Sequence, residues 1–208
     1  EMLKEHKKGM SKAEYKAAAI EDLADMGIPA PDIRYGEYPH QFSGGMRQRS
    51  MIAMGMSCEP KILLADEPTT ALDVTIQAQI LELINVIKKE RNLSVIFITH
   101  NMGVVANMAD RIAVMYAGKI VEEAPVEILF GNPSHPYTQG LIASVPKLGS
   151  GVKVLPSIPG SVPDLAAMPE GCRFAPRCKY ATDKCRKLNP ELFQIGENHR
   201  CRCWLMDK

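Results

Sequence analysis

FSGGMRQR at residues 42–49 and ILLADE at residues 62–67 are the two segments that decide the fold of this chain. In the first, a serine and two glycines come directly before a helical stretch, and free N–H groups at the start of a helix favour a bound phosphate. In the second, an apolar run typical of a central parallel strand ends in two carboxylates. Carboxylates at that edge of a sheet can hold Mg²⁺ and orient a water molecule. We therefore expect part of a nucleotide-hydrolysing protein.

Apolar periodicity around these two segments predicts an α/β core with a parallel sheet. A capping box at Ser11 and Glu14 predicts a helix that ends near Gly27. A β-hairpin downstream favours an antiparallel edge. The expected elements are helices over 45–57, 74–90, 101–108 and 136–144, strands over 61–66 and 93–99, and a hairpin over 111–116 and 119–123.

Thr99 and His100 close the second predicted strand. If the two strands are parallel, His100 lies at the same edge of the sheet as Asp66 and Glu67, where an imidazole can contact a γ-phosphate and fix a water molecule. A lone histidine at a strand end is more often a surface residue, but this position favours a functional one. The histidines that we interpret as structural or solvated are His6, His40, His135 and His199.

Length and composition place the chain among ordinary globular proteins. It has 208 residues, a formal net charge of +1 and 24% charged residues, so it can bury a real core and has no global polyelectrolyte role. No apolar run approaches the roughly 18 residues of a transmembrane helix, and no secretory signal is visible at the start. The first residue is Glu1 rather than Met, which favours an excerpt of a longer protein.

Composition changes after Phe130. Residues 131–208 contain 9 of the 15 prolines and five of the six cysteines, with little periodic structure beyond 136–144. Residues 171–208 carry nine Lys and Arg against four Asp and Glu, but no aromatic stacking series, so nucleic acid is not an expected partner. We predict three domains, which are a helical subdomain incomplete at its N-terminus (1–57), the C-terminal half of the α/β core (58–130) and an irregular Cys-rich extension (131–208).

The motifs resemble those of ATP-binding-cassette (ABC) ATPases over roughly residues 1–130. Residues 42–49 resemble the signature sequence, 62–67 the Walker B motif and 70–73 the D-loop, while His100 matches the switch histidine. The resemblance implies a RecA-like P-loop NTPase core with a helical subdomain, ATP and Mg²⁺ as ligands, and two cassettes that sandwich two ATP molecules. It further implies that Asp66 serves Mg²⁺, Glu67 is the general base and His100 senses the γ-phosphate. The residues implied to contact ATP or the opposite subunit are Ser43, Gly44, Gly45, Gln48 and Asp73.

Two departures from the family pattern bear on activity. Met46 stands where the family usually has Gln, a change of little weight because backbone N–H groups carry much of that contact. A phosphate loop ending in Gly-Lys-Ser/Thr (Walker A) is not found, since the only Gly-Lys pair, Gly118-Lys119, is followed by Ile120 in the predicted hairpin. We therefore expect the intact subunit to be an ATPase and the 208-residue chain alone to be inactive. The alternative is a truncated, non-catalytic regulatory or remnant module.

The extension narrows the resemblance. NPSHPYT at 132–138 and GCRFAPRC at 171–178 resemble the C-terminal region of oligopeptide and dipeptide importer ATPases, some of whose relatives import nickel. The spacing of the cysteines fits zinc less well, because zinc sites usually contain Cys pairs separated by about two to four residues. Free thiols and a redox protein built on the cysteines are the remaining alternatives. The resemblance implies a [4Fe–4S] cluster on Cys172, Cys178, Cys185 and Cys203, with Cys201 as the alternative fourth ligand.

The resemblance also implies partners. These are a second ABC ATPase subunit, identical or different, a pair of transmembrane permease subunits, and indirectly a substrate-binding protein. The location that it implies is the cytoplasmic face of the cell membrane, as a peripheral subunit. The sequence leaves open whether a peptide or nickel is carried.

Overall fold

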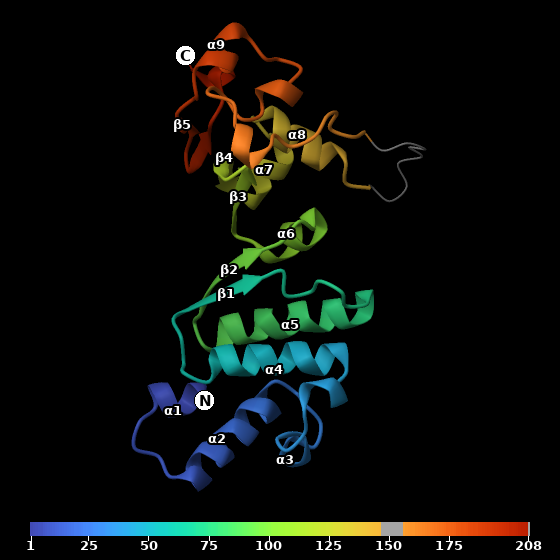
Figure 1. The fold of residues 1–208 in the computed structure, drawn as a ribbon, viewed down its shortest axis with the longest axis vertical. Helices are drawn as coiled ribbons and strands as arrows, with labels where there is room; N and C mark the ends of the chain where they lie inside the picture. Colours follow the sequence, from blue (N-terminus) through green and yellow to red (C-terminus); the bar gives the residue numbers. More distant parts are fainter. Residues whose placement is uncertain (147–155, 208) are drawn as a thin grey trace. The chain divides into compact units, whose positions relative to one another are not determined.

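A computed structural model describes residues 1–146 and 156–207 of the 208-residue chain (Figure 1). The chain divides into two compact units, Glu1–His100 and Asn101–Lys208. The division near residues 57 and 130 that the sequence favours stays a prediction. Within the described residues, no helix is both long and apolar enough to cross a bilayer.

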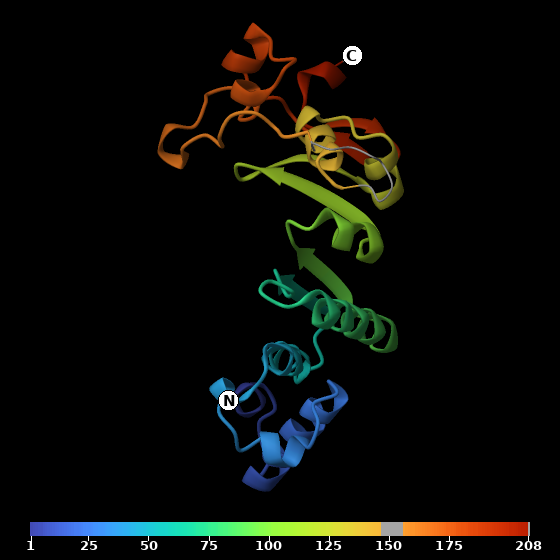
Figure 2. The ribbon, with the colours of Figure 1, turned by 90° about the vertical axis from the view of Figure 1, so that its right-hand side faces the viewer.

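The first unit is a layered α/β structure. Figures 1 and 2 show α5 lying between the two strands and α4, with α1 to α3 on the other side of α4. Ile80, Ile84 and Ile87 of α5 are buried, because their spacing of three and four residues puts them on one helix face. The elements of this unit are α1 (Met2–His6), α2 (Lys12–Asp25), α3 (Pro31–Arg34), a 3₁₀ turn (Pro39–Gln41), α4 (Gly44–Met56), β1 (Ile62–Asp66), α5 (Val74–Glu90) and β2 (Ser94–Ile98).

The strands β1 and β2 form a parallel pair whose register places Asp66 opposite Ile98. Successive side chains of a strand point to opposite faces of the sheet. On the covered face, Leu63 lies beside Gly55 of α4 and Ala65 is buried. The other face is open in the described structure, where four apolar residues are 45% to 61% exposed, namely Ile62, Leu64, Ile96 and Ile98.

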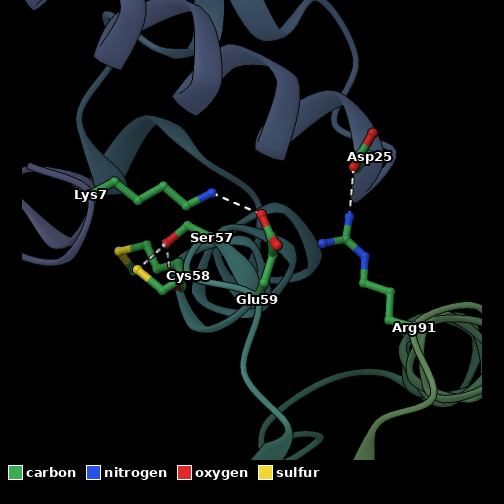
Figure 3. A network of polar contacts seen from close by, with 7 residues as sticks. Lys7, Asp25, Ser57, Cys58, Glu59 and Arg91 are labelled. Carbon is green, nitrogen blue, oxygen red and sulfur yellow. Dashed lines mark hydrogen bonds and ion pairs between the residues drawn. The ribbon is translucent and has the colours of Figure 1, made fainter. Parts of the chain in front are cut away.

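Two ion pairs fasten α1 and α2 to the segments that follow α4 and α5 (Figure 3). The Lys7 ammonium lies 3.0 Å from a Glu59 carboxylate oxygen, and the Arg91 guanidinium lies 2.8 Å from an Asp25 oxygen. The hydrogen bond between Lys7 and Glu59 raises the pKa of the lysine and lowers the pKa of the carboxyl. Both pairs face solvent, which screens them, so they orient the helices more than they stabilise them.

The second unit is built on one antiparallel sheet with the strand order β3-β4-β6-β5. Its elements are α6 (Met102–Met108), β3 (Arg111–Tyr116), β4 (Lys119–Pro125), α7 (Val126–Gly131), α8 (Pro136–Ala143), α9 (Asp183–Lys187), β5 (Phe193–Gly196) and β6 (His199–Cys201), with 3₁₀ turns at Leu165–Ala167, Ala175–Arg177 and Trp204–Met206. Its core gathers apolar side chains from the hairpin, α7 and a later loop, namely Val114, Tyr116, Val121, Ala124, Leu129 and Phe174.

The C-terminal extension differs from the separate, irregular body that the sequence favours. Strand β6 pairs with β4 and sets Cys201 opposite Glu122, so the extension widens the sheet of the hairpin. The two added strands have four and three residues, too few for a period of two to be recognised in the sequence. The predicted helix near 136–144 is present as α8.

Candidate functional site

The carboxyl edge of the parallel pair holds the acidic residues and the histidine that the sequence singles out. Asp66 is the last residue of β1, Glu67 follows it, and His100 lies shortly after the end of β2. Glu67 adopts a left-handed backbone with φ of 44°, which turns the chain at the strand end. Its N–H donates to the Ile98 carbonyl at 2.9 Å, so Glu67 is held beside the end of β2.

The side chains of Glu67 and His100 are in direct contact. His100 Nδ1 lies 3.0 Å from Glu67 Oε1, and the Thr70 hydroxyl donates to Glu67 Oε2 at 2.8 Å. The hydrogen bond from Thr70, and then the one from His100, hold the pKa of Glu67 below its ordinary value. The carboxylate is therefore ionised at neutral pH and exposed to solvent, as a group that accepts a proton from water must be.

The segment between β1 and α5 is a tight turn that ends in a helix cap. The Thr70 N–H donates to the Glu67 carbonyl at 3.1 Å, and Thr69 beside it is buried. Asp73 then caps α5, because its Oδ1 accepts from the Ile76 N–H at 2.9 Å. One turn thus holds both the Glu67 carboxylate and the Asp73 carboxylate.

Ser43, Gly44 and Gly45, which we call the signature turn, begin helix α4. Ser43 Oγ accepts from the Met46 N–H at 3.2 Å, and the next N–H, that of Arg47, donates to the Ser43 carbonyl. The N–H groups of the two glycines therefore precede the hydrogen-bond ladder of the helix. Ser43 is exposed whereas Gly45 is buried. A partner can reach the outer side of the turn, which the predicted sandwich of two cassettes requires.

The remaining predicted contact residue, Gln48, lies further along α4 and is half-buried. Its surroundings assign it no role, so its contact with nucleotide stays a prediction. A residue that the sequence reasoning missed is Ile76, which packs against Gly45 where α4 and α5 both begin. The two residues are far apart in the sequence, and no pattern in the sequence pairs them.

Four of the five C-terminal cysteines line one small cavity in the second unit. They are the four that the resemblance implies as cluster ligands, Cys172, Cys178, Cys185 and Cys203. The aromatic rings of Phe174 and Trp204 also line the cavity. Burial raises the pKa of Cys172 and Cys178, and it raises the pKa of Cys203 to about 11. These thiols therefore keep their protons at neutral pH unless a bound cation displaces them.

Backbone N–H groups donate hydrogen bonds to three of these sulfurs and oppose the effect of burial. The donors are Phe174 and Ala175 for Cys172, Tyr180 for Cys178, and Leu205 for Cys203. Hydrogen bonds to ligand sulfurs are among the features that tune iron–sulfur clusters. Within the described residues, no group of three or more His, Cys, Asp or Glu is arranged to hold a metal ion as it stands. Four thiols around one cavity, with N–H donors behind them, nevertheless form a donor set that fits an iron–sulfur cluster.

Cys201 belongs to a buried polar cluster that sequence reasoning missed. Glu122 on β4 is 0% exposed, and its carboxylate accepts from the N–H groups of Ser134 and His135 at 2.7 and 2.9 Å. His199 Nε2 lies 2.8 Å from the same carboxylate. Burial, with Glu122 close by, raises the pKa of the Cys201 thiol far above its usual range. The carboxylate joins β4, β6 and the start of α8, and its hydrogen bonds offset the cost of burying its charge.

Family models match both parts of the chain. The model of the ABC transporter family matches residues 1–70, and the model of the oligopeptide/dipeptide transporter C-terminal region matches residues 121–185. The oligopeptide transport ATP-binding protein OppD of Bacillus subtilis (strain 168) is 52% identical over 99% of this chain. The dipeptide transport ATP-binding protein DppD of Lactococcus lactis subsp. cremoris is 49% identical over 100% of this chain. The chain spans 58% and 59% of the length of these two curated relatives.

Solved structures of an ATP-binding cassette resemble the chain in fold. The dimeric structure of a post-hydrolysis state of the cassette MJ0796 bound to ADP and Pi is 29% identical, with a TM-score of 0.52 over 60% of this chain and 53% of that one. A further dimeric structure of MJ0796, a bacterial ABC transporter cassette, is 30% identical with a TM-score of 0.51. With cassette motifs followed by the peptide-transporter region, the chain belongs to the ABC transporter ATP-binding proteins of the oligopeptide/dipeptide group.

Proposed function

We propose that this chain is part of the ATP-hydrolysing subunit of an ABC importer for oligopeptides or dipeptides. The observation that carries the proposal is the contact between Glu67 and His100 at the carboxyl edge of the parallel pair, in a chain of this family. Relatives named as oligopeptide and dipeptide transport ATP-binding proteins support a peptide as the cargo.

In this proposal Glu67 accepts the proton of the water that attacks the γ-phosphate of ATP. Asp66 serves the Mg²⁺ ion, and His100 contacts the γ-phosphate and fixes the water. Thr70 and His100 each hold one oxygen of the Glu67 carboxylate. Water must therefore displace one of these two hydrogen bonds, or share its oxygen, before the proton is transferred.

The signature turn acts on the ATP that a second cassette holds. The N–H groups of Gly44 and Gly45 and the Ser43 hydroxyl are its donors to the γ-phosphate, with Gln48 nearby on α4. Asp73 bridges the two cassettes. Closure of the sandwich drives a pair of permease subunits at the cytoplasmic face of the membrane, with a substrate-binding protein delivering the cargo.

The test is ATP hydrolysis by the complete subunit assembled with its permease. Glu67→Gln keeps the size of the side chain but removes the base, so kcat falls by about 10²- to 10⁴-fold. Glu82→Gln, which changes an exposed carboxylate on α5, is the matched control and leaves kcat unchanged. Hydrolysis by the Glu67→Gln assembly at the rate of the parent would rule out Glu67 as the base.

We also propose that Cys172, Cys178, Cys185 and Cys203 hold a [4Fe–4S] cluster. The shared cavity and the N–H donors to three of the sulfurs support this assignment. Nine Lys and Arg against four Asp and Glu in residues 171–208 offset the negative charge of a thiolate-ligated cluster. When bound, the group supplies a covalent cross-link between loops that are far apart in the sequence.

Anaerobic purification tests the cluster. The protein is expected to be brown, to absorb near about 400 nm and to contain iron and acid-labile sulfide in equal amounts. Cys203→Ser lowers the iron content, whereas Cys201→Ser and Cys58→Ser, which change cysteines outside the cavity, leave it unchanged. A colourless protein with one zinc per chain would overturn the assignment.

A further inference from the structure

The first turns of α4 and α5 meet at a contact that only a glycine allows. A Cβ atom built on Gly45 would lie 2.9 Å from Ile76 Cγ2, closer than carbon atoms approach in folded proteins. Gly45 is buried, and Ile76 is half-buried. The helix starts therefore touch through the bare backbone of Gly45.

Both partners in this contact lie one turn from a cap that belongs to the proposed site. Gly45 belongs to the signature turn, capped by Ser43. Ile76 donates its N–H to the side chain of Asp73. The contact between Gly45 and Ile76 thus joins the signature turn to the turn that carries Asp73 and, further back, Glu67.

The two glycines of the signature turn differ in what surrounds them. A Cβ atom on Gly44 would lie 3.4 Å from Leu72 Cδ2, an ordinary distance at the end of a flexible side chain. A Cβ atom on Gly45 would press on a branched side chain that is fixed in the first turn of a helix. The packing of α5 therefore accounts for the second glycine but not for the first.

We propose that Ile76 is a positioning residue that sets the place of the signature turn, and that Gly45 is a glycine because Ile76 packs against it. The competing explanation is that Gly45 is a glycine so that the backbone can approach a phosphate. The two explanations differ in one respect. Shortening Ile76 relieves a clash with Ile76, but it cannot relieve a clash with ATP.

The inference rests on the proposed function for its kinetic test. In the assembled transporter, Gly45→Ala shifts the signature turn and lowers kcat by about 10- to 100-fold, because small misplacements of catalytic groups are costly. Gly45→Ala combined with Ile76→Ala, which removes Cγ2, recovers most of that loss. Gly45→Ala combined with Ile76→Val, which keeps Cγ2, does not recover it. A double variant with Ile76→Ala that is as slow as Gly45→Ala alone would overturn the inference.

A glycine in the same helix provides the matched control. A Cβ atom on Gly55 of α4 would lie 3.4 Å from Leu63 Cδ1, an ordinary contact. Gly55→Ala leaves kcat within about twofold of the parent. A loss in Gly55→Ala as large as that in Gly45→Ala would show that α4 tolerates no added methyl group, and it would overturn the specific role of Ile76.

Amide hydrogen exchange of the 208-residue chain separates this inference from the proposed function, because it needs no nucleotide. Gly45→Ala lowers the protection of the amides in the first turns of α4 and α5, and adding Ile76→Ala restores it. An assembly without ATPase activity would refute the proposed function while this exchange result stands. Unchanged protection in Gly45→Ala would refute the packing contact even if the assembly hydrolyses ATP.

Discussion

At the scale of single residues, Glu67 owes its low pKa to two neighbours. The Thr70 hydroxyl is the larger cause, because it donates directly to the charged form, and His100 is the next. A hydrogen bond to the ionised carboxylate lowers the pKa, so its removal raises the pKa toward the ordinary value for Glu. The protonation of Glu67 then begins at a higher pH.

Thr70→Val is expected to move the acidic limb of the pH–rate profile of the proposed ATPase to higher pH. The measurement is kcat/KM for ATP as a function of pH in the assembled transporter. Thr75→Val, which changes an exposed threonine in the first turn of α5, leaves the limb where it is. Coincident limbs in the Thr70→Val and parent profiles would contradict the role of Thr70.

His135 predicts an acid-sensitive second unit. Burial lowers the pKa of His135 to about 4, from an ordinary value of 6.5, although Glu122 nearby opposes the shift. Between these two values the unfolded chain binds a proton that the folded chain excludes, so stability falls as the pH drops from 6.5 to 4. The loss amounts to about 3 kcal/mol over this range. The other groups that meet in this cluster are Glu122, which accepts the His135 N–H, and His199 on β6.

The matched variant is His135→Asn. His135 Nδ1 accepts from the Tyr137 N–H at the start of α8, and an Asn oxygen can take over this cap without titrating. Urea unfolding of the metal-free chain, with folding of the second unit followed by the fluorescence of Trp204, measures the difference. The parent should lose stability between pH 6.5 and 4 more steeply than His135→Asn, and equal slopes would assign the acid sensitivity to other groups.

At the scale of elements, the caps of the helices provide the clearest local energies. Ser11 and Glu14 form a complete capping box on α2, in which each side chain bonds the backbone of the other. Ser11→Ala is expected to cost about 1 kcal/mol of the free energy of unfolding. Ser50→Ala is the control, because Ser50 lies inside α4 and bonds a backbone carbonyl already used by the helix. Denaturant unfolding that shows equal losses in the two variants would contradict the capping role.

Elements with a long period could be predicted from the sequence, whereas short ones could not. The helix expected over 74–90 is α5 with the same bounds, because Asp73 caps it and three buried isoleucines keep its period. The connection over 28–41, expected to be irregular, contains the four-residue helix α3 and a 3₁₀ turn. Strands β5 and β6 pair through backbone hydrogen bonds that do not depend on a periodic pattern of side chains.

The same limit applies to the candidate site. The approach of His100 to Glu67 could be predicted, because parallel strands bring their carboxyl ends to one edge. The contact between Gly45 and Ile76 could not, because it depends on how closely two helices approach. The buried charge of Glu122 was also missed, since a strand that reads Val121-Glu122-Glu123-Ala124 does not say which acid points inward.

At the scale of the whole molecule, one face of the parallel pair is apolar and open in the described structure. Parallel sheets are ordinarily covered on both faces. Ile62, Leu64, Ile96 and Ile98 together form an exposed apolar patch, and such patches promote association. We expect the purified 208-residue chain to associate with itself and to bind a hydrophobic dye.

Ile96→Lys places a charge in the middle of this patch and is expected to reduce both association and dye binding. Sedimentation velocity at several concentrations measures the first, and dye fluorescence measures the second. Val74→Lys is the control, because Val74 is 83% exposed and lies on α5, outside the patch. Equal improvement by both variants would attribute the effect to net charge rather than to the patch.

The left-handed backbone of Glu67 has a consequence for how such a chain ages once selection on transport relaxes. A residue with a Cβ atom is held in this conformation at a cost of roughly 1 kcal/mol, and glycine would adopt it without that cost. Among the substitutions open to a drifting gene, a single step to glycine would therefore leave the protein better folded and chemically silent. Thermal robustness and turnover are opposed at this one position, so a sturdier homologue is not for that reason a working one.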